Sequence, residues 1–415
     1  MFIAKSDEMD IKENLSVLKD IDNDAYQNLL SKIEFNKLQR FKKSCRQVIR
    51  RYLAGGVREF KKRKNIKDII HRINQPSPKK KILYVSALPT FNLVRQSIYL
   101  RRTGEFETII LMESPWLGDF TEKYFDAVYV YDSCYDLANI LKEVNPYIIH
   151  VLGCSFYSEY HGVLARLLNK SPVIFEFYDV ASLCIARDDP DAAKVWGRAN
   201  VELMFFSEKF VCERCDGLVL GYSPEALEIL KNRYNIKIPM LEFHAYACDE
   251  FASNASEKYS GQDGKIHLVL GGSVSPSTAH QKYFGHSKYH DLIKIVTKQG
   301  IFYDIYYSPH FSPTKAKRLY SDYLLMVKDN PFFKFQKGLL PDKVVKRFSK
   351  YDFGTTVSLY NRGTFLDVHN RTRLPGRFFL YLEAGLPQLV SDEMQYLARL
   401  IEDYEIGIVV SLKDL

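Results

Sequence analysis

The chain has 415 residues, a formal net charge of +8, and 46% hydrophobic and 26% charged residues. This length is too great for one ordinary core and predicts two domains, and the composition is typical of a soluble globular protein. No run approaches the roughly 18 apolar residues of a membrane span, and residues 1–10 lack a signal pattern. The seven scattered cysteines fit a reducing compartment. A cytoplasmic protein is predicted.

Residues 1–78 are predicted to form a helical, basic extension. Apolar residues recur at helical spacing from Leu15 to Ile33 and continue from Leu38 to Tyr52. Residues 37–64 hold twelve Lys or Arg and one acid, a net +11, so the rest of the chain is about −3 (+8 − 11). The segment could lie on the anionic inner surface of a membrane or pack on the other domains. It could also bind nucleic acid, although nucleic acid is not among the expected partners.

Residues 79–256 are predicted to form one Rossmann-like domain and residues 257–415 a second. In both, short apolar runs alternate with helical patterns, which indicates parallel sheets covered on both faces. The small polar segment 252–264 is typical of an interdomain linker. The fold class is therefore α/β with two doubly wound domains. The predicted strands are Ile82–Ala87, Thr108–Met112, Ala127–Tyr131, Tyr147–Leu152, Val173–Phe177, Gly217–Leu220, Ile266–Leu270, Ile301–Tyr306, Phe332–Gln336, Phe353–Val357, Gln388–Ser391 and Gly407–Val410.

Segment 374–392 carries the strongest motif. A Pro-Gly pair opens a predicted helix, and Gly385 ends it before the next strand. Arg371, Arg373 and Arg377 lie near the N-terminus of this helix, which is already positive. Their position there indicates a bound anion such as a nucleotide diphosphate, because guanidinium groups and backbone N–H groups both match phosphate oxygens. A solvated basic turn is the alternative.

This segment resembles the signature of GT-B glycosyltransferases, especially family 4, whose members often have a stretch like P-N-K-F-F-E-Y-L-A-A-G-L-P-V-I-V-S. Gly376 and Arg377 take the places of Asn and Lys. The resemblance covers about residues 80–415 and is strongest over 335–410. The residues that match are Pro375, Phe378, Phe379, Tyr381, Leu382, Ala384, Gly385, Leu386, Pro387, Val390 and Ser391.

The resemblance implies a hexosyltransferase-type glycosyltransferase (EC 2.4) that uses no metal or other cofactor and retains the anomeric configuration. The second domain would hold the nucleotide-sugar donor, and the first would take a glycan or lipid-linked acceptor, as in polysaccharide biosynthesis. Relatives continue with further helices past the position of Val410, so the second domain is expected to be truncated. A sugar-nucleotide epimerase of the same architecture and a catalytically silent GT-B scaffold are the alternatives.

One position departs from the family pattern. The family's carboxylate, thought to hold the donor ribose, aligns with Leu380, and leucine cannot accept a hydrogen bond from a hydroxyl group. Glu383 lies one helical turn further on and is the candidate ribose ligand in its place. An ordinary helix acid is the alternative for Glu383.

Gly271, Gly272 and Ser273 follow the first predicted strand of the second domain. Glycines here let backbone N–H groups approach a ligand closely, and in GT-B enzymes the corresponding turn faces the donor diphosphate. A simple tight turn is the alternative. The histidines between residues 280 and 290 lack the spacing and the paired carboxylates of a metal site, so no metal is predicted.

Glu176, Tyr178 and Asp179 stand at the end of the predicted strand Val173–Phe177 and are the candidate catalytic residues. Doubly wound sheets place ligands at this carboxyl edge. Family relatives often have a His-Asp pair here, and Tyr178 replaces the His. A carboxylate at this place could orient the acceptor hydroxyl or act as a base. Helix capping by Asp179 is the alternative.

Overall fold

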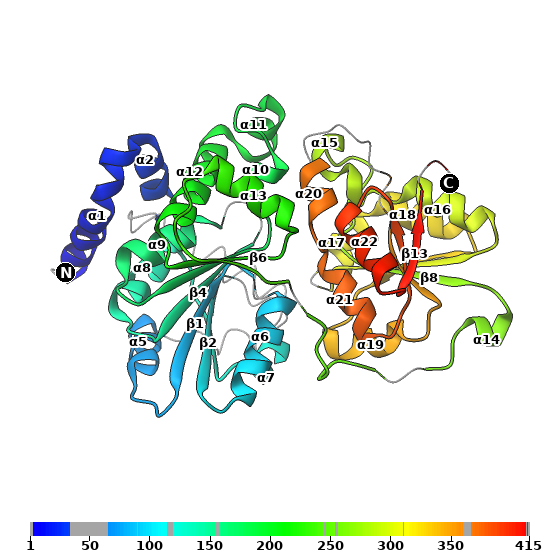
Figure 1. Cartoon of the computed structure of the whole chain (residues 1–415), viewed down its shortest axis with the longest axis horizontal. Coiled ribbons are helices and arrows are strands. Elements are labelled where there is room, and N and C mark those ends of the chain that lie inside the picture. The colour runs from blue at the N-terminus through cyan, green and yellow to red at the C-terminus, as the bar shows by residue number, and fades with distance from the viewer. Residues whose placement is uncertain are drawn as a thin grey trace. The chain divides into compact units, whose positions relative to one another are not determined.

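The computed structural model describes residues 3–33, 65–88, 90–113, 119–154, 158–244, 246–253, 256–309, 311–357, 359, 367–411 and 413. The chain separates into two compact units (Figure 1). Unit 1 consists of Met1–Leu220 and Leu227–Phe243, and unit 2 consists of Gly221–Ala226 and His244–Leu415. The basic segment 37–64 lies outside the described residues, so its predicted partners stay predictions.

Unit 1 is built on a parallel sheet with strand order β3-β2-β1-β4-β5-β6-β7 within the described residues. Its central strands are apolar and buried along almost their whole length, as expected for a parallel sheet with helices on both faces. The strands are β1 (Lys80–Ser86), β2 (Phe106–Met112), β3 (Ala127–Val130), β4 (Ile148–Gly153), β5 (Val173–Phe177), β6 (Gly217–Leu220) and β7 (Met240–Glu242).

Helices connect these strands and cover the sheet (Figure 1). In chain order they are α5 (Ile66–Asn74), α6 (Phe91–Arg102), α7 (Asp119–Tyr124), α8 (Cys134–Glu143), α9 (Tyr160–Leu168), α10 (Ala181–Cys184), α11 (Pro190–Trp196), α12 (Arg198–Arg214) and α13 (Pro224–Arg233). Among the helices that the structure describes, none is both long and apolar enough to cross a bilayer.

The first two helices, α1 (Ile3–Ile21) and α2 (Asn23–Ile33), pack on unit 1. Helix α1 contacts α8 and α9, and α2 contacts α8 and α12. Leu15, Leu18, Leu29 and Ile33 are fully buried by this packing. Burial of such apolar side chains stabilises the docked position, so the described part of the predicted extension belongs to the body of unit 1.

Unit 2 repeats the plan with strand order β10-β9-β8-β11-β12-β13, again parallel throughout. The strands are β8 (His267–Gly272), β9 (Phe302–Tyr307), β10 (Phe333–Lys337), β11 (Phe353–Thr356), β12 (Gln388–Ser391) and β13 (Gly407–Val410). The helices are α14 (Ser260–Asp263), α15 (Gln281–Phe284), η1 (Gly285–Ser287), α16 (His290–Lys298), α17 (Pro313–Leu319), α18 (Ser321–Asp329), α19 (Pro341–Phe348), α20 (Asp367–Thr372), α21 (Gly376–Glu383) and α22 (Gln395–Asp403).

Both sheets reverse their winding at a central pair of strands. The reversal falls between β1 and β4 in unit 1 and between β8 and β11 in unit 2. Open α/β sheets bind ligands at the carboxyl ends of the strands beside such a switch point. The predicted fold class, α/β with two Rossmann-like doubly wound domains, is confirmed, and it is the plan that the GT-B resemblance implies.

Candidate functional site

The turn that follows β8 lies at the switch point of unit 2. Gly272 has φ of +122°, a conformation that residues with a side chain rarely adopt. A Cβ atom on Gly271 would lie 2.7 Å from Cε2 of Phe348, so a side chain does not fit there without displacing the ring. The two glycines are therefore required by the backbone shape of the turn and by its close packing.

One amide of this turn already has a partner. The Gly271 N–H donates to the hydroxyl of Tyr381, with N and Oη 3.2 Å apart. Tyr381 is fully buried on α21, and its ring also packs against Phe348. Gly272 and Ser273 are exposed, so the turn presents the backbone of these two residues to solvent.

Helix α21 brings Arg377 to the same place. The helix leads directly into β12, so its first turn lies at the carboxyl edge of the sheet. Nη1 of Arg377 donates to the Tyr289 hydroxyl over 3.1 Å. Nη2 lies 3.8 Å from the point that a Cβ on Gly272 would occupy. Arg377 and the glycine turn, which the sequence predicted to act together, are thus neighbours.

Arg373 lies just before the same helix. Its Nη1 contacts Nε2 of His369 over 2.8 Å, and Nδ1 of His369 lies 2.9 Å from the hydroxyl of Tyr222. Nε of Arg373 is buried and has no hydrogen-bond partner in the part of the chain that the structure describes. Sequence reasoning did not find Tyr222 or His369, because no motif contains them.

The three arginines of this region differ in their counter-charges. Arg371 forms ion pairs with Glu225 and with Asp367, the latter over 2.8 Å. Arg373 and Arg377 form no ion pair with any described carboxylate, and their hydrogen-bond partners are an imidazole nitrogen and a phenol. Two cations without a counter-ion among the described residues, beside exposed backbone at a helix N-terminus, form a site suited to an anion.

Two histidines near the arginines are held neutral. Burial, together with the charges of Arg373 and Arg377, lowers the pKa of His286 to about 3. Burial, Arg373 and His286 lower the pKa of His369 well below its usual value. After burial, Arg373 contributes to the pKa shift of both histidines and Arg377 to that of His286, because a nearby positive charge disfavours a protonated imidazole.

Glu383, the predicted ribose ligand, faces another part of unit 2. The residue is 2% exposed, and its Oε1 accepts a hydrogen bond from the backbone N–H of Cys248 over 2.9 Å. This contact gives Glu383 a structural function in fixing segment 248–253. Leu380 lies beside Gly271, 3.6 Å from the point of its absent Cβ. The ribose role of Glu383 stays a prediction.

In unit 1, Glu176 belongs to a buried polar network. Its Oε2 accepts from Nε2 of Gln96 over 2.8 Å and lies 2.8 Å from Nε2 of His150. His150 is on β4 and Gln96 is on α6, so the network spans the switch point of this sheet. Tyr178 is 39% exposed, and Asp179 is half-buried.

Asp179 is not the cap of the helix that follows it. Val180 occupies the N-cap position of α10, and the carboxylate of Glu208 accepts from the backbone N–H of Ser182 over 2.9 Å. The charge of Asp179 instead acts on a second carboxyl. Burial, then Glu208 and Asp179, raises the pKa of Glu159 well above its usual range.

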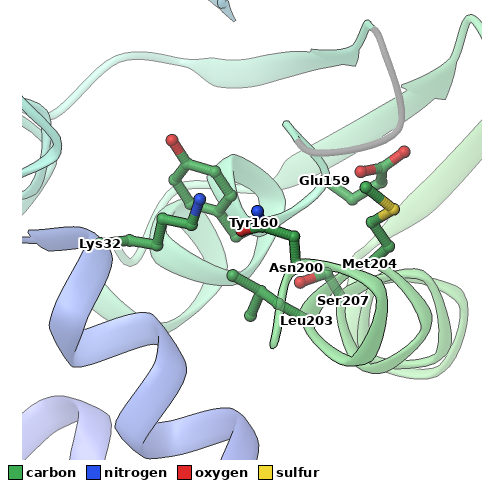
Figure 2. Close-up of a pocket in the computed structure, with 7 residues that line it drawn as sticks. All are labelled: Lys32, Glu159, Tyr160, Asn200, Leu203, Met204 and Ser207. Atoms are coloured by element: carbon green, nitrogen blue, oxygen red, sulfur yellow. The ribbon is translucent and has the colours of Figure 1, made fainter. Parts of the chain in front are cut away.

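Glu159 lines a small indentation between α2, α9 and α12 (Figure 2). It is fully buried, and neither of its carboxyl oxygens has a hydrogen-bond partner on another described residue. Figure 2 shows the carboxyl group beside Met204, with Ser207 on the same helix and Lys32 entering from α2. Glu159 follows β4 as Asp179 follows β5, so both belong to loops at the carboxyl edge of the sheet.

No family model matches the chain, and no curated protein does. Solved structures that resemble it include TcCGT1 in complex with UDP (10% identity, TM-score 0.45, covering 80% of this chain and 86% of the other). Others are a Thermobaculum terrenum O-GlcNAc transferase mutant (11%, 0.43, 82% and 62%) and a UDP-glucosyltransferase from Polygonum tinctorium (11%, 0.42, 81% and 85%). With TM-scores below 0.5, these similarities do not assign an activity to this chain.

Proposed function

We propose that the chain is a glycosyltransferase of the GT-B type, similar to family 4, that holds the diphosphate of a nucleotide sugar at the basic edge of unit 2. The observation that carries the proposal is the pair Arg373 and Arg377, which lack carboxylate partners among the described residues and lie at the N-terminus of α21. Arg377 also adjoins the Gly272 turn. A pyrophosphate fits such a place because it brings two phosphate groups to two guanidinium groups.

The chemistry follows from where charge develops. When the bond between the sugar C1 and the diphosphate oxygen breaks, negative charge grows on the departing diphosphate. Arg373, Arg377 and the positive end of α21 stabilise that charge in the transition state. One such contact contributes on the order of 10²-fold in rate. We propose that these groups act without a metal ion, and that the anomeric configuration is retained, as the family resemblance implies.

The carboxyl edge of unit 1 is proposed to receive the acceptor, a glycan or a lipid-linked sugar. Asp179 would orient the acceptor hydroxyl or take its proton. Glu176 already accepts from Gln96 and pairs with His150, so we propose that it supports the shape of this edge. Tyr178 is exposed and would contact the acceptor.

The first test is nucleotide binding. UDP, GDP, CDP, ADP and TDP, and their sugars, are compared by thermal shift, since a ligand that binds only the native state stabilises it by about 2.7 kcal/mol at 100 times Kd. The active nucleotide should lose its effect in Arg377→Gln and keep it in Arg399→Gln, which changes an exposed arginine of α22. Absence of a response to every nucleotide would overturn the proposal.

The second test separates the three activities that this fold allows. A glycosyltransferase needs both donor and acceptor, whereas a sugar-nucleotide epimerase converts the donor alone, and a silent scaffold binds without turnover. In a transferase, Asp179→Asn should lower transfer and leave donor affinity unchanged. Conversion of the nucleotide sugar in the absence of any acceptor would establish the epimerase instead.

We also propose a cytoplasmic location, with segment 37–64 drawing the protein to an anionic membrane surface. The segment has a net charge of +11, and each basic residue near such a surface contributes about 1 kcal/mol. Sedimentation with vesicles rich in phosphatidylglycerol, but not with pure phosphatidylcholine, is expected. Equal behaviour with both kinds of vesicle would contradict this location.

A further inference from the structure

The geometry points to Tyr222 and His369 as positioning residues that hold the Arg373 guanidinium with one edge presented to a phosphate group. The inference rests on the proposed function, because it needs an anion at the basic edge of unit 2. Neither residue belongs to the motif that the sequence displays. Both are buried, with 1% of Tyr222 and 3% of His369 exposed.

The guanidinium group of Arg373 has one edge that contacts His369 and another that can bind a ligand. Nη1 is used by His369, over 2.8 Å. Nε and Nη2 share another edge of the group, and this edge carries two parallel N–H donors that match two oxygens of a phosphate. Nε on that edge is buried without a partner in the described part of the chain. A buried donor of this kind is unfavourable unless a ligand satisfies it, so the edge is arranged for an acceptor that arrives from outside.

His369 can hold Arg373 in this way only in one tautomer. A neutral imidazole carries a single N–H, and the nitrogen that faces a guanidinium donor must be the bare one. The hydrogen-bond network therefore places the proton on Nδ1, which donates to the Tyr222 hydroxyl over 2.9 Å. The Tyr222 hydroxyl thereby determines that Nε2 is the acceptor, as outer partners do for metal-binding histidines.

The backbone reinforces the same arrangement. Ser223 N–H donates to the carbonyl of Thr372 over 2.7 Å, and Tyr222 forms an antiparallel bridge with Arg373. Glu225, two residues further on, pairs with Arg371. Segment 222–225 thus holds segment 371–373 through main chain and side chains together. A guanidinium fixed in this way loses less conformational entropy when it binds a ligand.

The experiment measures the affinity of inorganic pyrophosphate and of orthophosphate by calorimetry, at one fixed salt concentration. His369→Leu removes the acceptor, and Tyr222→Phe frees the imidazole proton to move to Nε2, where it opposes Arg373. Both variants should bind pyrophosphate about 3- to 10-fold more weakly, the effect of one neutral hydrogen bond. Orthophosphate, which Arg377 can hold alone, should change less. His369→Gln keeps an acceptor and should retain most of the affinity.

Tyr396→Phe is the matched control, because it removes a Tyr–His hydrogen bond of the same 2.9 Å length that involves neither arginine. The inference is overturned if His369→Leu and Tyr222→Phe bind pyrophosphate like the wild type, or if Gln and Leu at position 369 weaken it equally. If His369→Leu does not fold, Tyr222→Phe, which removes one oxygen atom, decides. Failure of the wild type to bind pyrophosphate or any nucleoside diphosphate overturns the proposed function instead.

Discussion

The carboxyl edges of the two sheets share a strand order and differ in charge. In unit 2 the edge carries Arg373 and Arg377, which have no acidic partner among the described residues. In unit 1 the corresponding edge carries the acids Glu176 and Asp179, together with Glu159, whose raised pKa favours the uncharged carboxyl group. The two strand orders match around the switch point, and unit 1 adds β7 at its outer end. The difference in charge at the switch point therefore comes from the side chains there. The doubly wound plan places both edges beside a switch point, and we expect the charge of each edge to select the ligand that it binds.

The largest expected effect comes from removing a charge at the basic edge. Arg377→Gln should lower kcat/KM for sugar transfer by about 10² to 10³, because it removes one donor to the departing diphosphate. Arg377→Lys should recover only part of the rate, since a lysine presents a point charge without the paired N–H groups. Steady-state kinetics with the nucleotide sugar found by thermal shift measure both. A Gln variant with wild-type kinetics would mean that the two edges do not differ in the proposed way.

The glycine turn offers a second way to test the basic edge. Gly272→Ala should destabilise the protein by about 1–3 kcal/mol, because Gly272 has φ of +122°. It should also weaken diphosphate binding, since the added Cβ would contact Arg377. Gly300→Ala is the control: its φ is +74°, and no other heavy atom lies near the added carbon. Denaturant titration and calorimetry should show lost stability in both variants and lost affinity only at Gly272.

A titratable group near each edge should make the free energy of unfolding depend on pH, with opposite signs in the two units. In unit 2 this group is His286. Its folded pKa of about 3 lies below the usual value near 6.5, so only the unfolded chain takes up the proton in this window. The neutral His286 side chain therefore costs the folded state nothing above pH 6.5, and the free energy of unfolding decreases as the pH falls below that value. His286→Gln should gain about 2 kcal/mol relative to the wild type between pH 7 and pH 5. Denaturant titration at the two pH values measures this, and NMR should show His286 unprotonated at pH 5.

In unit 1 the titratable group is Glu159, and its effect on the free energy of unfolding should be the smallest of the four. Its folded pKa is raised, first by burial and then by Glu208 and Asp179, so its stability contribution is greatest at low pH and declines as the pH rises above about 4.5. Glu159→Gln stays neutral and should be more stable than the wild type at pH 7, by about 1 kcal/mol. The gain should disappear near pH 4. A loss of stability at pH 7 would show that Glu159 is charged and paired.

Much of the fold was predictable because it depends on local patterns. Strands β5, β6, β12 and β13 begin and end at the predicted residues, since short apolar runs between turn residues define buried parallel strands. The end of α21 was also predicted, and Gly385 adopts the expected left-handed conformation with φ of +61°. Strand β7 was missed, because it has only three residues and Leu241 is 55% exposed.

The candidate site was predictable only in part. The meeting of Arg377 with the Gly272 turn follows from topology, because both stand at the carboxyl edge beside the switch point. The residues that hold the two arginines could not be predicted, since Tyr222, Tyr289 and His369 come from separate segments and belong to no motif. Single-sequence patterns report helix faces and strand alternation, and they do not report which distant side chains meet.

The position of segment 221–226 in the chain matters when the two units are expressed separately. This segment follows β6 of unit 1 in the chain, yet it is counted with unit 2. An expression fragment that starts at His244 would therefore lack Tyr222, which hydrogen-bonds His369, and Glu225, which pairs with Arg371. Such a fragment would keep every strand of its sheet while losing the support of Arg373, so the recombinant half should be a poorer nucleotide binder than the intact polypeptide.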